Sequence, residues 1–204
     1  TIIITTFKSD KKIQRCLNSI TESVKILIIE NSDNNKFKED IESKYSQVEC
    51  ILVGSNKGYS TANNIGLSKI NTKFALVLNP DTILEKDTLK NFFKTAKTFP
   101  DFWLIGPGNS KNENNYKDNV LEVENIKGYA IFFNLKKFNK IFFDENFFLY
   151  FEEIDLCRRV KKNNGKIYLD KKIIINHRGA QSVDTTFKHE LEKNRNWHWM
   201  WSTY

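Results

Sequence analysis

The stretch that most constrains this 204-residue chain is an apolar run that stops abruptly at a polar turn. Phe74 to Leu78 reads F-A-L-V-L, which suits a strand buried on both faces. Pro80 cannot donate to a β-ladder and disfavours helix at the residue before it, so the strand is predicted to end there. Asp81 then follows the carboxyl end of a central strand, where open α/β sheets bind ligands. An Asp in this position also suits a turn or a helix cap.

Apolar runs and helical patterns alternate through much of the chain, which predicts βαβ units and a largely parallel sheet. Asp10 is the expected cap of the first helix, and Gly165 is the expected end of a basic amphipathic helix that begins near Glu152. The strands are predicted to begin at Ile2 and to cover 25–30, 48–53, 74–78, 103–106, 126–133, 166–169 and 172–176, with helices at 37–45 and 86–99.

The length favours a single domain, and 40% hydrophobic residues suit a globular core. Three cysteines without metal-type spacing indicate a reducing compartment, and no apolar run reaches the roughly 20 residues of a membrane span, so we expect a cytoplasmic protein. The formal charge is +7, with a basic cluster at 158–162. The cluster suits a solvated helix face, a phosphate-bearing ligand or an anionic membrane, and no nucleic-acid module is recognised.

Three further stretches carry candidate chemistry. The loop and helix at 54–67 offer backbone N–H groups that suit phosphate, although a tight helix–sheet contact explains its small residues equally well. Glu152, Glu153 and Asp155 follow an aromatic run, where a partly buried carboxylate can act as a base; the same acids also favour a helix dipole. His177 follows a strand and suits either a structural role or a metal ligand.

Four patterns stand in a fixed order: E-N-S, N-K-G-Y-S-T-A-N-N-I-G, L-N-P-D-T, and F-L-Y-F-E-E-I-D-L-C-R-R with H-R-G-A-Q-S downstream. Together they resemble the family-2 glycosyltransferases, in particular the bacterial branch that includes rhamnosyltransferases. The resemblance implies an α/β fold of GT-A type, with a mostly parallel sheet flanked by helices. It also implies a donor-binding half at 1–106 and an acceptor and catalytic-base half at 107–204. From the abrupt C-terminal end we expect that the chain has been cut from a longer protein.

The resemblance also implies a metal site for Mg²⁺ or Mn²⁺. Asn79-Pro80-Asp81 matches the family's short acidic motif, with Asn79 in place of its first acid. Mg²⁺ suits such a site because it is commonly coordinated by substrate phosphates and keeps several bound waters. His177 matches a family histidine that can complete the site, and Mn²⁺ tolerates such a nitrogen.

The remaining expected site residues follow from the same resemblance. Glu30 stands where the family has an Asp that contacts the base or ribose of a nucleotide-diphospho-sugar. Glu153 is expected to be the catalytic base, in a pair with Glu152, while Asp155 and Arg158 support that loop beside the substrate. The other residues expected to line the donor are Thr5, Thr6, Phe7, Asn31, Asn56, Gly58 and Asn63.

The expected acceptor is a saccharide, in particular a lipid-linked one at the cytoplasmic membrane surface. The charge and the aromatic residues Trp197, Trp199, Trp201 and Tyr204 favour peripheral membrane contact, although these aromatics equally suit packing on the domain. An inverting enzyme of surface polysaccharide synthesis is the leading hypothesis. A weak or inactive relative stays open, and a nucleotidyltransferase is disfavoured because its Gly-rich N-terminal loop is missing.

Overall fold

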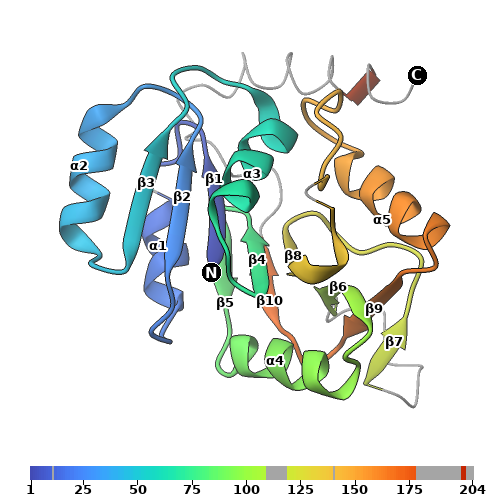
Figure 1. The fold of residues 1–204 in the computed structure, drawn as a ribbon. Helices are drawn as coiled ribbons and strands as arrows, with labels where there is room; N and C mark the ends of the chain where they lie inside the picture. The colour runs from blue at the N-terminus through green and yellow to red at the C-terminus, as the bar shows by residue number, and fades with distance from the viewer. Residues whose placement is uncertain (11, 109–118, 140, 178–198, 201–204) are drawn as a thin grey trace.

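A computed structural model describes residues 1–10, 12–108, 119–139, 141–177 and 199–200. Within them, a large sheet has the strand order β3-β2-β1-β4-β8-β6-β9-β7, and β5 and β10 form a second, two-stranded sheet (Figure 1). The strands are β1 Ile2–Thr6, β2 Ile26–Glu30, β3 Val48–Leu52, β4 Phe74–Leu78, β5 Thr82–Leu84, β6 Phe102–Pro107, β7 Val120–Glu122, β8 Ala130–Asn134, β9 Lys166–Asp170 and β10 Ile175–His177. The helices are α1 Ile13–Ser19, α2 Asn35–Lys44, α3 Gly58–Lys69, α4 Thr88–Thr98 and α5 Glu152–Lys162, with a 3₁₀ turn at Leu135–Lys137.

The first half of the chain builds a parallel half-sheet. β1 lies between β2 and β4 and is parallel to both, and β3 extends the same direction on the far side of β2. β8 then runs antiparallel to both β4 and β6, β9 is parallel to β6, and β7 is antiparallel to β9. The sheet is therefore mixed but mostly parallel, as predicted, and the carboxyl ends of β1, β2 and β4 meet at one edge.

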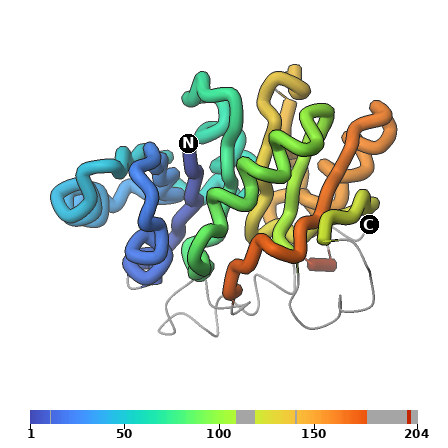
Figure 2. The backbone as a smooth tube through the Cα atoms, turned by 90° about the horizontal axis from the view of Figure 1, so that it is seen from below, coloured from blue at the N-terminus to red at the C-terminus, as the bar shows by residue number. Residues whose placement is uncertain are grey.

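The side chains of the sheet pack into two cores, one on each face. In β4, Leu76 and Leu78 pack with α1, α2 and α4, whereas Ala75 and Val77 pack with α3 and α5. This alternation follows from the two-residue side-chain period of a strand, and it explains why the central strands are apolar throughout. Figure 2 shows the N-terminal part of the chain, in blue, and the orange part that includes α5 at opposite ends of the molecule.

Several predicted boundaries differ from the structure. The residue before α1 is Lys12 and makes no side-chain cap, so the prediction that Asp10 caps this helix was wrong. Near the end of α5, Asn164 rather than Gly165 has a left-handed backbone, with φ of 55°. The strand predicted at 126–133 begins only at Ala130, and the one predicted at 172–176 is the short β10.

Candidate active site

The turn after β4 is fixed by hydrogen bonds to its own backbone and to the neighbouring strand. The N–H of Asn79 donates to the carbonyl of Tyr129 at 2.9 Å. The Thr82 hydroxyl donates back to the carbonyl of Asn79 at 2.7 Å, which closes the N-P-D-T turn. Asp81 is therefore held at the end of the central strand, as the sequence predicted.

His177 reaches this turn through the second sheet. β10 pairs antiparallel with β5 and places His177 opposite Thr82. The Nε2 atom of His177 lies 3.3 Å from Oδ1 of Asp81, whose side chain is only 4% exposed. The ring of Tyr129 stacks on the imidazole, with centroids 4.6 Å apart and planes 14° apart, and so fixes its orientation.

The donor atoms at this turn fit a divalent cation that also binds substrate phosphates. Asn79 Oδ1 is buried and has no hydrogen-bond partner among the described residues, so an oxygen ligand is available beside Asp81. No group of three or more His, Cys, Asp or Glu side chains suited to a metal occurs in the described part of the chain. Asp81 and His177, with the Asn79 oxygen, form a sparse set, which suits an ion that completes its shell with phosphates and water.

Glu30 ends β2 and is fixed by two short hydrogen bonds. The hydroxyls of Thr6 and Ser32 each donate to one of its carboxylate oxygens at 2.5 Å. The residue is 1% exposed, and burial raises the pKa of its carboxyl group although both hydrogen bonds oppose that shift. Thr6 and Glu30 thus stand together on neighbouring strands at the predicted donor edge.

The side chain of Asn31 supports the loop before α3, a role that the sequence did not reveal. Its side-chain amide donates to Oδ1 of Asn56 at 2.9 Å and to the carbonyl of Gly58 at 3.0 Å. Its Oδ1 accepts the N–H of Lys57 at 2.8 Å. Both ends of the amide are used by the loop before α3, so Asn31 holds that loop against β2.

The start of α3 packs tightly against the segment that precedes α5. Gly58 has φ of +84°, and a Cβ there would lie 2.6 Å from the backbone oxygen of Phe148. The same oxygen accepts the N–H of Tyr59 at 2.7 Å. On the other side, the Thr5 hydroxyl donates to Oδ1 of Asn63 at 3.0 Å, which joins β1 to the helix. Glycine is needed here for both its backbone conformation and the absence of a side chain.

The two glutamates of the predicted catalytic pair form the first turn of α5. Glu152 is 6% exposed; burial, and then the charge of Glu153, raise the pKa of its carboxyl group to about 8. Its Oε2 has no hydrogen-bond partner among the described residues. Burial also raises the pKa of Glu153, and the charge of Lys127 opposes this shift. Of the two, Glu153 is the less buried.

The chain enters α5 through a strained backbone. Tyr150 and Phe151 have φ of 72° and 66°, values that side-chain-bearing residues rarely adopt. Each such residue costs on the order of 1–3 kcal/mol and persists only when its surroundings enforce it. Two residues before Tyr150, the carbonyl of Phe148 accepts the N–H of Tyr59, which ties this segment to the start of α3. These two strained residues directly precede Glu152 and Glu153 in the chain.

Tyr59, in the first turn of α3, is linked through Gly128 to the surroundings of Glu153. Burial raises the pKa of its phenol well above its usual value, and the charges of Glu152, Glu153 and Asp81 raise it further. Its hydroxyl donates to the carbonyl of Gly128 at 2.9 Å, and a Cβ on Gly128 would lie 3.4 Å from Glu153. Tyr59 of α3 and Glu153 of α5 thus both lie against Gly128.

The support of the α5 loop differs from the prediction. Asp155 accepts a hydrogen bond from Nε of Arg159 at 2.6 Å, whereas Arg158 is exposed. Arg159 also donates to the carbonyl of Phe142 at 2.6 Å. The sequence pointed to Arg158 as the residue that supports this loop with Asp155, whereas in the structure Arg159, one position later, binds Asp155. On an amphipathic helix, a change of one position turns the side chain by about 100°, from solvent toward the domain.

A family model described as glycosyl transferase family 2 matches residues 1–158. The chain belongs to this family. The match includes Asp81 and both glutamates and ends before His177. Family membership confirms the predicted resemblance and supports glycosyl transfer as the enzyme class.

Two curated relatives have names that agree with this class. A low-salt glycan biosynthesis hexosyltransferase, Agl10 of Haloferax volcanii, is 25% identical over 95% of this chain and 68% of its own length. The rhamnosyltransferase WbbL of Escherichia coli strain K12 is 27% identical over 74% of this chain and 71% of its own length. These similarities support sugar transfer in glycan synthesis.

Solved structures confirm the GT-A fold. The mannosyltransferase PcManGT of Pyrobaculum calidifontis, in complex with GDP-Man and Mn²⁺, matches with a TM-score of 0.71 at 12% identity over 87% of this chain and 57% of its own. TarS 1–349 of S. aureus in complex with UDP-GlcNAc matches with a TM-score of 0.65 at 16% identity over 88% of this chain and 60% of its own. The match to another TarS structure covers only 34% of that chain. This chain therefore spans between a third and three fifths of the length of these solved structures.

Proposed function

We propose that this family member is a metal-dependent inverting glycosyltransferase that moves a sugar from a nucleotide-diphospho-sugar to a saccharide or lipid-linked acceptor. The observation that carries the proposal is Asp81 at the carboxyl end of β4, 3.3 Å from His177, together with the two glutamates in the first turn of α5. A cation ligand and a proton acceptor are the two groups that such a transfer needs at one place.

In this proposal the donor lies along the carboxyl edge of β1, β2 and β4. Thr5, Thr6, Phe7 and Glu30 contribute to the nucleoside subsite, and the loop at 56–58, held in place by Asn31, borders it. Asp81 and His177, with Asn79, hold Mg²⁺ or Mn²⁺, which when bound supplies positive charge against the diphosphate. Structural neighbours in complex with UDP-GlcNAc, or with GDP-Man and Mn²⁺, support this donor and metal class.

Glu153 acts as the catalytic base. Its carboxylate takes the proton of the acceptor hydroxyl as that oxygen bonds to the anomeric carbon. The bond from this carbon to the diphosphate oxygen breaks on the opposite side, so the nucleoside diphosphate leaves and the configuration inverts. Burial raises the pKa of Glu153, which makes its carboxylate a stronger base than an exposed one.

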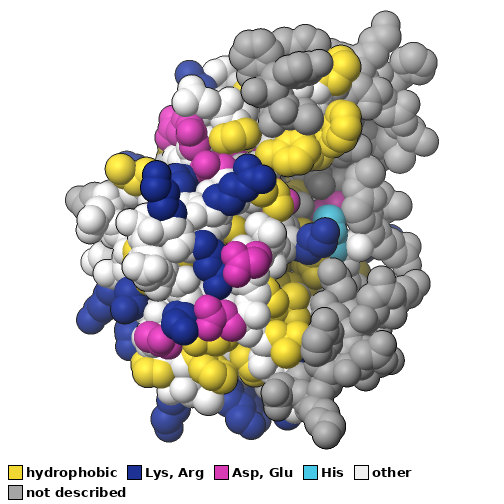
Figure 3. All heavy atoms as spheres, turned by 90° about the vertical axis from the view of Figure 1, so that its right-hand side faces the viewer, with side chains coloured by type: hydrophobic (Ala, Val, Ile, Leu, Met, Phe, Trp, Pro, Cys, Tyr) yellow, Lys and Arg dark blue, Asp and Glu magenta, His cyan; other side chains and the backbone are white. Residues whose placement is uncertain are grey.

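The acceptor half, residues 107–204, is proposed to bind a saccharide close to a membrane surface. Phe151, directly before the glutamate pair, lies 6.4 Å from Trp199 between ring centroids, and Trp199 is 55% exposed. Figure 3 looks at the side of the molecule that is on the right in Figure 1, and it shows hydrophobic side chains beside Lys, Arg and acidic ones. No helix in the described ranges is long and apolar enough to cross a membrane. Trp197, Trp201 and Tyr204 lie outside those ranges.

A donor and metal screen tests the proposal. The purified protein is incubated with UDP-, GDP- and dTDP-sugars, with Mg²⁺, with Mn²⁺ or with chelator, and with saccharide acceptors, while released nucleoside diphosphate is measured. Acceptor-stimulated, metal-dependent release and a product of inverted anomeric configuration are expected. Donor binding without release would favour the inactive relative that Asn79 and Glu153, in place of the family's usual acids, leave open. Release of a nucleoside monophosphate or of pyrophosphate would contradict the proposal.

A further inference from the structure

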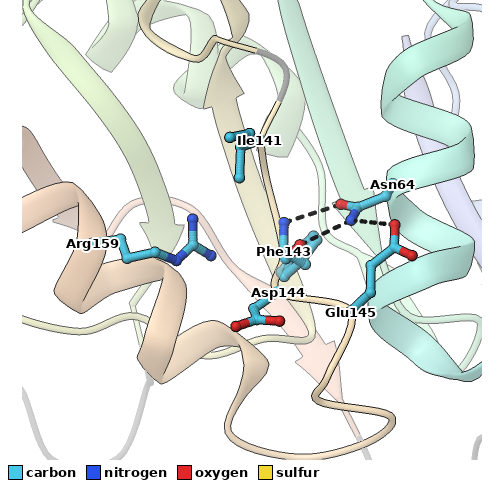
Figure 4. Close-up of a pocket in the computed structure, with 6 residues that line it drawn as sticks. All are labelled: Asn64, Ile141, Phe143, Asp144, Glu145 and Arg159. Atoms are coloured by element: carbon cyan, nitrogen blue, oxygen red, sulfur yellow. Dashed lines mark hydrogen bonds between the residues drawn. The ribbon is translucent and has the colours of Figure 1, made fainter.

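The segment at 141–145 lies between α3 and α5, and neither the turn at 79–82 nor the glutamate pair includes it. It lines a cavity of about 350 Å³ together with Asn64 of α3 and Arg159 of α5 (Figure 4). Side chains from both helices bind its backbone.

Asn64 pairs with Phe143 as a neighbouring strand would. Its Oδ1 accepts the N–H of Phe143 at 3.0 Å, and its Nδ2 donates to the carbonyl of the same residue at 2.9 Å (Figure 4). Nδ2 also donates to Glu145 at 3.0 Å, and the other oxygen of that carboxylate accepts the Thr61 hydroxyl at 3.2 Å. α3 therefore holds two positions of the segment through one amide and one hydroxyl.

Arg159 holds the same segment from α5. Its Nη2 donates to the carbonyl of Phe142 at 2.6 Å, while its Nε is fixed by Asp155 one turn earlier. Phe143 is 2% exposed and packs in the same core as Leu156 and Cys157 of α5. Because close-packed side chains transmit displacements, a shift of this segment moves the helix whose first turn carries the glutamates.

We propose that Asn64 is a positioning residue of the transfer reaction. It fixes the distance between the donor-side helix α3 and the base-bearing start of α5 through the backbone of Phe143. The inference rests on the proposed function because it takes Glu153 as the base. A displacement of about 1 Å at a reacting group can cost on the order of 100-fold in rate, so a hydrogen bond remote from the chemistry can control turnover.

The test compares two variants with a matched control. Asn64→Ala removes both backbone bonds. Asn64→Asp keeps an acceptor for the Phe143 N–H but loses the donor and places a second carboxylate beside Glu145. Ser68→Ala is the control because Ser68 is an exposed residue of the same helix whose hydroxyl donates only within it, to Ile65. If Asn64→Ala does not fold, Asn64→Asp carries the test.

Transfer kinetics give the first readout. In the Asn64 variants kcat is expected to fall about tenfold, while the calorimetric Kd of a nucleoside diphosphate with Mn²⁺ changes less than about twofold. Ser68→Ala keeps both values. A role in folding alone would lower the fraction of protein that binds the nucleotide in step with kcat. Such parallel loss, or an unchanged kcat, would overturn the proposal.

Hydrogen exchange gives a second readout that does not depend on transfer. The amides at 150–156 of the Asn64 variants are expected to exchange about tenfold faster than in the wild type, with β4 unchanged. Wild-type exchange at 150–156 in both variants would overturn the coupling. If the wild type transfers no sugar, the proposed function fails, whereas the exchange result still decides whether Asn64 holds the start of α5.

Discussion

Asp81 and His177 lie far apart in sequence, yet the carboxylate and the imidazole are 3.3 Å apart because β5 pairs with β10. β5 directly follows the turn that carries Asp81, and β10 ends in the histidine. The pairing therefore brings a carboxylate oxygen and an imidazole nitrogen, the groups proposed to hold the cation, to one place. A small sheet of two three-residue strands makes this half of the site.

Asp81→Ala is expected to abolish metal-dependent nucleotide binding while leaving the fold intact. The variant removes the carboxylate that the proposed cation needs, and it lies in a turn outside both cores. Calorimetric titration of a nucleoside diphosphate with and without Mn²⁺ measures the effect. Asp87→Ala, at a half-exposed acid before α4, is the control. Metal-dependent affinity equal to that of the wild type would remove Asp81 from the site.

Gly58→Ala is expected to destabilise the protein more than Gly54→Ala does. Both glycines have φ of +84°, a left-handed value that strains an alanine at either position. Only at Gly58 would the new Cβ meet the backbone of Phe148, whereas nothing lies within 4 Å at Gly54. We expect a loss of about 1 kcal/mol at Gly54 from the conformation alone and a larger loss at Gly58. Urea denaturation compares the two, and equal losses would show that the contact with Phe148 yields without cost.

The raised pKa of Glu152 predicts how the free energy of unfolding depends on pH. Its folded pKa, about 8, lies above the ordinary 4.5 of an unfolded glutamate, so the folded state binds the extra proton. This contribution is fully present below pH 4.5 and is lost as the pH rises toward 8, at up to about 1.4 kcal/mol per pH unit. Glu152→Gln is expected to flatten this part of the stability curve.

Urea denaturation at pH 5, 6, 7 and 8 measures the Glu152 effect. Glu39→Gln, at an exposed glutamate of α2, is the matched control and is expected to keep the wild-type slope. Parallel curves for the wild type and Glu152→Gln would show that this carboxyl group is ionised in the folded protein throughout the range.

Membrane contact is tested by co-sedimentation with vesicles. The charge of +7 and the exposed Trp199 predict binding to anionic but not neutral vesicles, weakened by salt and by Trp199→Ala. Each Lys or Arg near an anionic surface contributes roughly 1 kcal/mol. No sedimentation with either vesicle type would favour an acceptor that is not membrane-bound.

The sequence predicted the central strand and its polar turn because an apolar run followed by proline has few alternatives. It also predicted the glutamate pair at the start of α5, through both the aromatic run and the family resemblance. It missed β5 because three residues carry too little periodicity to identify a strand. It could not show that Arg159 rather than Arg158 binds Asp155, since a choice between neighbouring arginines depends on which helix face meets the domain.

The structural role of Asn31 also could not be predicted from the sequence. An asparagine after a strand suits ligand contact or loop support equally well, and only the packing of the loop at 56–58 against β2 shows that its amide is occupied. Gly58 carried a better signal, because a glycine at a helix start often marks a close approach. Its partner, the backbone of Phe148, is nevertheless ninety residues away and unpredictable from local pattern.

The central claim is that Glu153 takes the acceptor proton. The amide in Glu153→Gln has the same shape but cannot accept it, so donor affinity is expected to stay within about twofold of the wild type while kcat falls by at least about 100-fold. Glu152→Gln is the matched control and is expected to keep transfer activity. The decisive measurement is kcat of both variants beside the calorimetric Kd of the donor nucleotide. An active Glu153→Gln with an inactive Glu152→Gln would contradict the account and assign the base to the buried member of the pair.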